Sequence, residues 1–125
     1  MSSKISKPFH FFYLKVDSTN EIFVRQYGNK QGVPIILLHG GPGAAYSNDN
    51  ISKIVDLKKT HLIIMDQRGC GKSKPKFTIH NKNNLLSDIK KVKEYLKIKK
   101  FIITGGSWGA ILSLLYTIQY PKEII

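Results

Sequence analysis

The chain has 125 residues and a formal net charge of +12, from 20 lysines and arginines against 8 aspartates and glutamates. This length allows one domain at most, and no apolar run approaches the length of a membrane span. The single cysteine, Cys70, excludes an internal disulfide bond and fits a cytoplasmic location. The positive charge is almost all lysine, without the arginines and exposed aromatic residues that favour a nucleic-acid site. We therefore expect neither nucleic acid nor a membrane as a partner.

Short apolar runs and longer apolar stretches alternate along the chain. The short runs predict five strands, over 9–16, 21–28, 34–38, 61–66 and 101–104. The longer stretches predict three helices, over 47–59, 83–96 and 109–120. The last of these helices is apolar nearly all round, so we expect it to be buried on most sides. A hairpin followed by alternating strands and helices predicts an α/β fold, with a mostly parallel sheet and helices on both of its faces.

The third predicted strand runs directly into a glycine-rich loop, consisting of His39, Gly40, Gly41, Pro42 and Gly43. A serine hydrolase takes one of its two oxyanion donors from a loop of this kind, because glycine offers a bare backbone N–H to the substrate. We expect that donor to be the N–H of Gly41.

The fourth predicted strand also ends in a polar, glycine-rich loop, whose residues include Asp66, Gln67, Arg68, Gly69, Cys70, Gly71, Lys72 and Ser73. The end of this loop is similar to a phosphate-binding loop, but such a loop requires a glycine where Asp66 stands. Cys70 is interpreted as a small loop residue rather than a nucleophile.

The fifth predicted strand leads into a Gly-x-Ser-x-Gly motif, formed by Gly105, Gly106, Ser107, Trp108 and Gly109. A strand, a tight turn and a helix in this order are the setting of a nucleophile elbow. Ser107 is then the candidate nucleophile, and the N–H of Trp108 is the other oxyanion donor. The alternative is a glycine-rich turn in which Ser107 is an ordinary helix N-cap.

The three loops, in this order and spacing, resemble those of the proline iminopeptidases (prolyl aminopeptidases) of the α/β-hydrolase superfamily. The resemblance covers residue 9 to the C-terminus and implies that 1–125 is a partial core domain, with the first five strands of the fold. It assigns a motif or structural role to His39, Gly40, Gly43, Asp66, Gln67, Arg68, Gly69, Gly105, Gly106 and Gly109. It implies no metal and no organic cofactor.

The resemblance further implies release of an N-terminal proline from a peptide, with Ser107 attacking the carbonyl group. The family's catalytic Asp and His, and its helical cap, lie beyond the part that this chain covers. The four histidines of the chain are His10, His39, His61 and His80, and none follows Ser107 as the order of the triad requires. Only His39 is expected near Ser107, in a structural role. We therefore expect little activity from the chain alone.

Two other interpretations stay open at this point. The chain is either part of a different α/β-hydrolase, such as an esterase, or a split-gene or decayed remnant without catalysis. If the fold stops after the helix over 109–120, the strand over 101–104 is an open sheet edge. A complementing C-terminal polypeptide, or self-association, is then expected to cover that edge.

Overall fold

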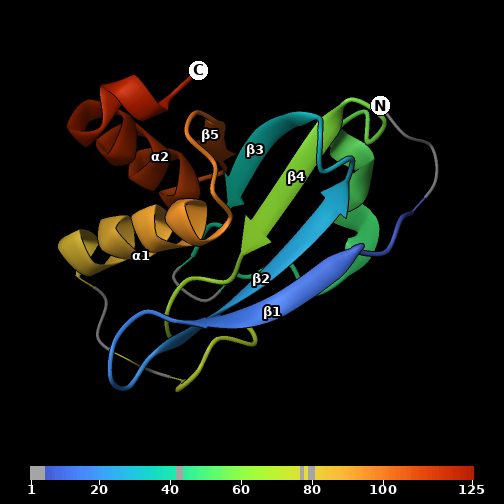
Figure 1. The fold of residues 1–125 in the computed structure, drawn as a ribbon. Coiled ribbons are helices and arrows are strands. Elements are labelled where there is room, and N and C mark those ends of the chain that lie inside the picture. Colours follow the sequence, from blue (N-terminus) through green and yellow to red (C-terminus); the bar gives the residue numbers. More distant parts are fainter. Residues whose placement is uncertain (1–4, 42–43, 77, 79–80) are drawn as a thin grey trace.

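The computed structural model describes residues 5–41, 44–76, 78 and 81–125. Pro42, Gly43 and His80 of the sequence analysis lie outside the described residues. Five strands form one sheet in the order β1-β2-β4-β3-β5 (Figure 1). Their bounds are His10–Lys15 for β1, Glu21–Gly28 for β2, Val33–Leu38 for β3, Thr60–Met65 for β4 and Ile102–Gly105 for β5.

The sheet is mixed rather than mostly parallel. β3 runs parallel to both β4 and β5, whereas β2 runs antiparallel to both β1 and β4. In register, Leu38 at the end of β3 pairs with Met65 of β4 and with Gly105 of β5. The three parallel strands therefore end at one level, and the loops that follow them begin side by side.

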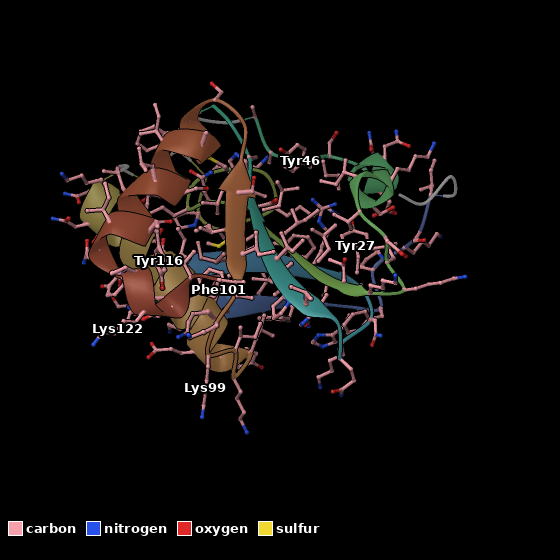
Figure 2. All side chains as sticks on the ribbon, turned by 90° about the horizontal axis from the view of Figure 1, so that it is seen from above. Tyr27, Tyr46, Lys99, Phe101, Tyr116 and Lys122 are labelled. Atoms are coloured by element: carbon pink, nitrogen blue, oxygen red, sulfur yellow. The ribbon has the colours of Figure 1, made fainter. Side chains whose placement is uncertain are left out.

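Helices lie on both faces of the sheet (Figure 1). On one face, α1 (Lys82–Tyr95) and α2 (Trp108–Gln119) cover the larger apolar core. On the other face, Tyr27 and Leu62 belong to a smaller core that Tyr46 and Ile51 help to cover. Figure 2 shows Phe101 and Tyr116 on the side of the two long helices, and Tyr27 and Tyr46 on the opposite side.

The helix predicted over 47–59 is wrong in type and length, because only the 3-10 helix η1 (Asp49–Ile54) forms there. The Asn48 side chain caps it by accepting a hydrogen bond from the Asn50 N–H, and Val55 has returned to extended backbone. The side chains of asparagine, aspartate and serine form hydrogen bonds to nearby backbone groups, which compete with a helix. The β-branched residues of this stretch lose rotamer freedom in a helix, so the stretch has a weak helical preference. Ile51 and Val55 still pack on the small core.

The helix α2 is less buried than its all-round apolarity predicted. Only Gly109, Leu112, Ser113 and Tyr116 are buried, at the three- and four-residue spacing of a single helix face. Ile111, Leu114 and Ile118 remain 53%, 61% and 69% exposed. The apolar sequence predicted that neighbouring elements would cover most of the surface of α2. In the described structure, α1 and the sheet cover only one face of this helix.

A buried ion pair joins the loop after β4 to α1. The guanidinium of Arg68 donates two hydrogen bonds of 2.8 Å to the carboxylate of Asp88 and lies 3.2 Å from a carboxylate oxygen of Asp17. Arg68 and Asp88 are 6% and 1% exposed. Burial raises the pKa of the Asp88 carboxyl even though Arg68 acts to lower it, so forming this pair involves a considerable desolvation cost.

Asp88→Ala is expected to lower the free energy of unfolding by about 3–5 kcal/mol, because it leaves the Arg68 charge buried without its main partner. Glu94→Ala on the same helix is the matched control, since Glu94 is exposed. Urea denaturation followed by circular dichroism measures both variants. Equal losses of stability would show that the Arg68–Asp88 pair does not anchor the loop to α1.

Candidate active site

Three loops meet where the parallel strands end, and Gln67 joins them. Its backbone N–H donates to His39 Nε2 over 3.0 Å, and its side-chain Nε2 donates to the backbone oxygen of His39 over 2.9 Å. Its Oε1 accepts a hydrogen bond of 3.1 Å from the indole Nε1 of Trp108. Gln67 is 2% exposed. The loop after β4 thus fixes the loop after β3 relative to the first residue of α2.

Ser107 occupies a strained turn between β5 and α2. Its φ and ψ are 54° and −121°, in a region that a residue with a side chain rarely adopts, at a cost of about 1–3 kcal/mol. Its side chain makes no capping hydrogen bond to the helix, so the alternative of an ordinary N-cap serine does not describe this turn. The residue is exposed. Its hydroxyl is left available at the N-terminus of α2.

The glycines on either side of Ser107 allow α2 to start against the end of β3. A Cβ placed on Gly105 would lie 2.4 Å from the backbone oxygen of Leu38, and one on Gly109 would lie 2.2 Å from the same oxygen. A Cβ on Gly106 would meet nothing within 4 Å. Gly105 and Gly109 are therefore required by backbone contact, whereas Gly106 is not.

These contacts predict different effects for two neighbouring substitutions. Gly109→Ala is expected to lower the free energy of unfolding by about 1–3 kcal/mol, because α2 or β3 must move to admit the methyl group. Gly106→Ala, the matched control, is expected to stay within about 0.5 kcal/mol of the parent chain. Urea denaturation of the two variants is the measurement. Similar stability of both would contradict the close approach of Gly109 to β3.

His39 is held in a structural role by hydrogen bonds to both of its ring nitrogens. Nε2 accepts the Gln67 backbone N–H, so it carries no proton, and Nδ1 donates to the backbone oxygen of Gly40 over 2.7 Å. A ring bonded in this way has no nitrogen left to take a proton from Ser107. His61 is buried in β4, and its Nε2 contacts the Gln26 side chain, which in turn contacts His10.

Trp108, the first predicted oxyanion donor, follows Ser107 directly, and the loop that carries the second, Gly41, approaches Ser107 through Gly40. The first turn of α2 uses the N–H groups of Gly109 and Ala110, which donate to Gly106 and Ser107 oxygens. Among the described residues, no backbone acceptor is found for the N–H of Trp108. Gly40 approaches from the other loop, where an added Cβ would lie 3.3 Å from Ser107 Cβ and 4.0 Å from its Oγ. Gly41 follows with a φ of 124°.

Asp66 shapes the loop that follows β4. Its Oδ2 accepts the Lys72 N–H over 2.9 Å, and its backbone oxygen accepts the Ser73 hydroxyl over 2.5 Å. Gly69 and Gly71 adopt φ values of 75° and 54° in this turn. Burial raises the pKa of the Asp66 carboxyl. The Asp66 side chain also lines a cavity of about 330 Å³.

Sequence reasoning missed two acidic residues that join parts of the fold around this site. Asp88 holds Arg68 from α1, and Glu123 binds residues of both long helices. Neither belongs to a motif, and the pairs of Asp88 with Arg68 and of Glu123 with Lys90 join residues 20 and 33 positions apart. In the part of the chain that the structure describes, no cluster of three or more His, Cys, Asp or Glu residues could hold a metal ion. No described helix is both long and apolar enough to cross a membrane.

Comparison with known proteins places this arrangement among hydrolases. Residues 33–124 match the α/β-hydrolase fold family. The chain is 41% identical over 123 residues to a proline iminopeptidase of Neisseria meningitidis, covering 97% of this chain and 39% of the relative. It is 34% identical over 120 residues to a proline iminopeptidase of Arabidopsis thaliana, covering 94% and 31%. These relatives confirm the resemblance that the three loops predicted.

Solved structures agree on the fold. The crystal structure of a proline iminopeptidase from Mycobacterium smegmatis superposes with a TM-score of 0.78 at 24% identity, over 92% of this chain and 41% of that one. A proline iminopeptidase-related protein from Thermus thermophilus gives a TM-score of 0.80 at 23% identity, over 90% and 41%. The chain spans about two fifths of the length of the Neisseria relative and of both structures.

Proposed function

The chain belongs to the α/β-hydrolase fold family, and on this premise we propose that it carries the nucleophile and the oxyanion hole of a serine hydrolase. The observation that carries the proposal is the backbone of Ser107. A serine at positive φ, between a strand and a helix and without a capping bond, is what a nucleophile elbow requires. Backbone strain of this kind concentrates at functional sites, so it favours a nucleophile elbow over an ordinary turn.

In the proposed chemistry, Ser107 Oγ gives its proton to a general base and bonds to a carbonyl carbon, so the C=O double bond opens and its oxygen becomes negatively charged. When the double bond re-forms, the amine leaves with that proton, and water releases the acyl group from Ser107 by the same two steps. The N–H groups of Trp108 and Gly41 stabilise the negative charge on the oxygen, and the N-terminal end of α2 adds its dipole. The residues proposed to hold the loops that carry these donors are His39, Gly40, Gln67, Arg68 and Gly69. The same role is proposed for Gly43.

The general base and its acid are proposed to come from polypeptide outside these 125 residues. In this fold the triad runs serine, acid, histidine along the chain, and no histidine follows Ser107 in the sequence. His39, the histidine of the glycine-rich loop beside Ser107, has both ring nitrogens bonded. We accordingly propose that 1–125 is a partial core domain that acts only when the rest of a hydrolase is supplied.

The proposed reaction is the release of an N-terminal residue, preferentially proline, from a peptide with a free N-terminus. The names of relatives 34–41% identical to the chain support this choice. The proposed compartment is the cytoplasm, since the single cysteine, Cys70, is buried and no disulfide bond is needed.

The test is an assay of the chain assembled with the part of the Neisseria meningitidis relative that follows its matched segment. We expect turnover of a proline arylamide, and its loss in Ser107→Ala. A short-chain p-nitrophenyl ester is the comparison substrate. Turnover of the ester alone would replace the aminopeptidase by an esterase. An assembled complex that hydrolyses neither substrate would contradict the proposal.

A further inference from the structure

A groove of about 710 Å³ lies at the end of the sheet opposite the three loops of the candidate active site. Its lining residues come from the start of β1, the end of β2, the start of β4 and the C-terminal end of α1. They include Phe9, Gln26, Lys30, His61, Tyr95 and Lys97, and we call this hollow the His61 groove. Its volume is in the range of sites that hold small molecules.

Two buried polar side chains, Gln26 and His61, line the groove and bond to each other. His61 Nε2 donates to Gln26 Oε1 over 2.7 Å, and Gln26 Nε2 donates to His10 Nδ1 over 3.0 Å. Burial and the positive charge of Lys30 lower the pKa of His61, so its ring is uncharged at neutral pH and holds its proton on Nε2. Nδ1 of His61 is then an acceptor, and it has no hydrogen-bond partner among the described residues. Such an acceptor favours a ligand with an N–H or O–H donor.

Two lysines, Lys30 and Lys97, bring positive charge to the groove. None of its described lining residues is acidic, and no described carboxylate forms an ion pair with either lysine. The charge of Lys30 reaches the buried part of the groove, since it acts on His61. Two cations beside an uncharged polar pair favour an anionic group, such as a phosphate.

Lys97 stands in a backbone conformation that favours glycine. It has a φ of 58° and directly follows Leu96, the C-cap of α1. The Lys97 N–H donates to the Glu94 oxygen and the Ile98 N–H to the Lys93 oxygen, and these bonds fix the left-handed turn that ends the helix. A lysine in this turn costs conformational energy that a glycine would avoid. Strain of this kind points to a function, and the charge of Lys97 at the groove offers one.

Two exposed aromatic rings, Phe9 and Tyr95, complete the lining. The ring centroid of Phe9 lies 5.9 Å from that of His61, and the ring centroid of Tyr95 lies 4.9 Å from that of Phe12. Each ring is therefore supported by a neighbouring ring while much of its surface stays exposed. Exposed aromatic rings offer stacking faces to a planar ligand.

We propose that the His61 groove binds a mononucleotide, with its phosphate at Lys30 and Lys97, its base on the exposed aromatic rings, and a base N–H donating to His61 Nδ1. A nucleotide combines the three chemistries that the groove presents, which are an anion, a planar ring and a hydrogen-bond donor. The groove lies at the opposite end of β4 from the loops around Ser107, so this proposal does not depend on the proposed hydrolase chemistry.

The experiment measures the binding of AMP to the 125-residue chain by isothermal titration calorimetry, with inorganic phosphate and adenosine as separate ligands. We expect AMP to bind at least tenfold more tightly than either of its parts, and to shift the ¹⁵N resonance of His61 Nδ1. Phe9→Ala is expected to weaken AMP binding roughly tenfold through the loss of a stacking ring. Phe11→Ala is the matched control, because Phe11 is also exposed but does not line the groove.

Lys97→Gly tests the charge without disturbing the turn. It is expected to weaken AMP binding roughly tenfold, because a cation that bonds the phosphate is removed. Its urea midpoint is expected not to fall, because glycine adopts a positive φ without strain. Lys97→Arg keeps the charge and is expected to keep most of the affinity. Lys100→Ala is the control for net charge, since Lys100 is exposed and lies outside the groove.

Several results would overturn the nucleotide proposal. They are the absence of AMP binding, binding of inorganic phosphate as tight as that of AMP, and an unmoved His61 Nδ1 resonance in the AMP-bound chain. Equal effects of Phe9→Ala and Phe11→Ala on AMP affinity would also overturn it, as would equal effects of Lys97→Gly and Lys100→Ala.

Discussion

The 125-residue chain alone is expected to turn over a proline arylamide no faster than its Ser107→Ala variant. A serine hydroxyl is a weak nucleophile until a base removes its proton. Both ring nitrogens of His39 are bonded within the loops, and no histidine follows Ser107 in the sequence. Loss of the serine or histidine from a catalytic triad lowers kcat by roughly 10⁶, and what remains comes from the oxyanion hole and substrate binding.

The measurement is arylamine release by the purified chain, by the chain assembled with the complementing polypeptide, and by the Ser107→Ala form of each. A large gain is expected only in the assembled form that retains Ser107. The chain alone and both alanine forms are expected to share the background rate. If the pure chain hydrolyses the arylamide at an ordinary enzymatic rate, and Ser107→Ala abolishes this, a base exists within the 125 residues and the two-part proposal is wrong.

Much of the fold could be predicted because its elements are marked locally. Each strand is a short apolar run bounded by turn residues, and the helix predicted over 83–96 is found as Lys82–Tyr95. The helix predicted over 47–59 was wrong because the prediction used only the spacing of apolar residues. The asparagine, aspartate and serine residues of this stretch favour caps and turns. The antiparallel pairing of β2 with β4, which attaches the predicted hairpin to the parallel strands, joins segments far apart in the sequence and could not be predicted.

The meeting of the three loops could also be predicted, since parallel strands that follow one another carry their C-terminal loops to the same edge. The bonds that fix these loops could not. Gln67 reaches His39 and Trp108 across 28 and 41 residues of sequence. No local pattern specifies such a pair, and the proton position on His39 follows only from its two partners. The exposure of apolar residues on α2 could not be predicted either, because an apolar sequence does not show which neighbouring element covers it.

Gly41→Pro is expected to lower kcat of the assembled enzyme by roughly 10²–10³ relative to Gly41→Ala. Loss of one oxyanion donor costs about 2.7–4 kcal/mol in transition-state stabilisation, and proline has no N–H. The structure shows why the alanine control is needed. Gly41 has a φ of 124°, which neither alanine nor proline adopts without strain, so both variants disturb the loop. Only the proline variant also removes the donor.

The comparison is informative only if both variants keep the elbow. Trp108 is the single tryptophan of the chain, and its indole Nε1 donates to Gln67, so its fluorescence reports on the contact between the loops and α2. Unchanged emission in both variants would show that the elbow is intact, and the kcat ratio then measures the missing N–H. If Gly41→Ala and Gly41→Pro lose activity equally, the loss comes from backbone strain, and Gly41 does not donate to the oxyanion.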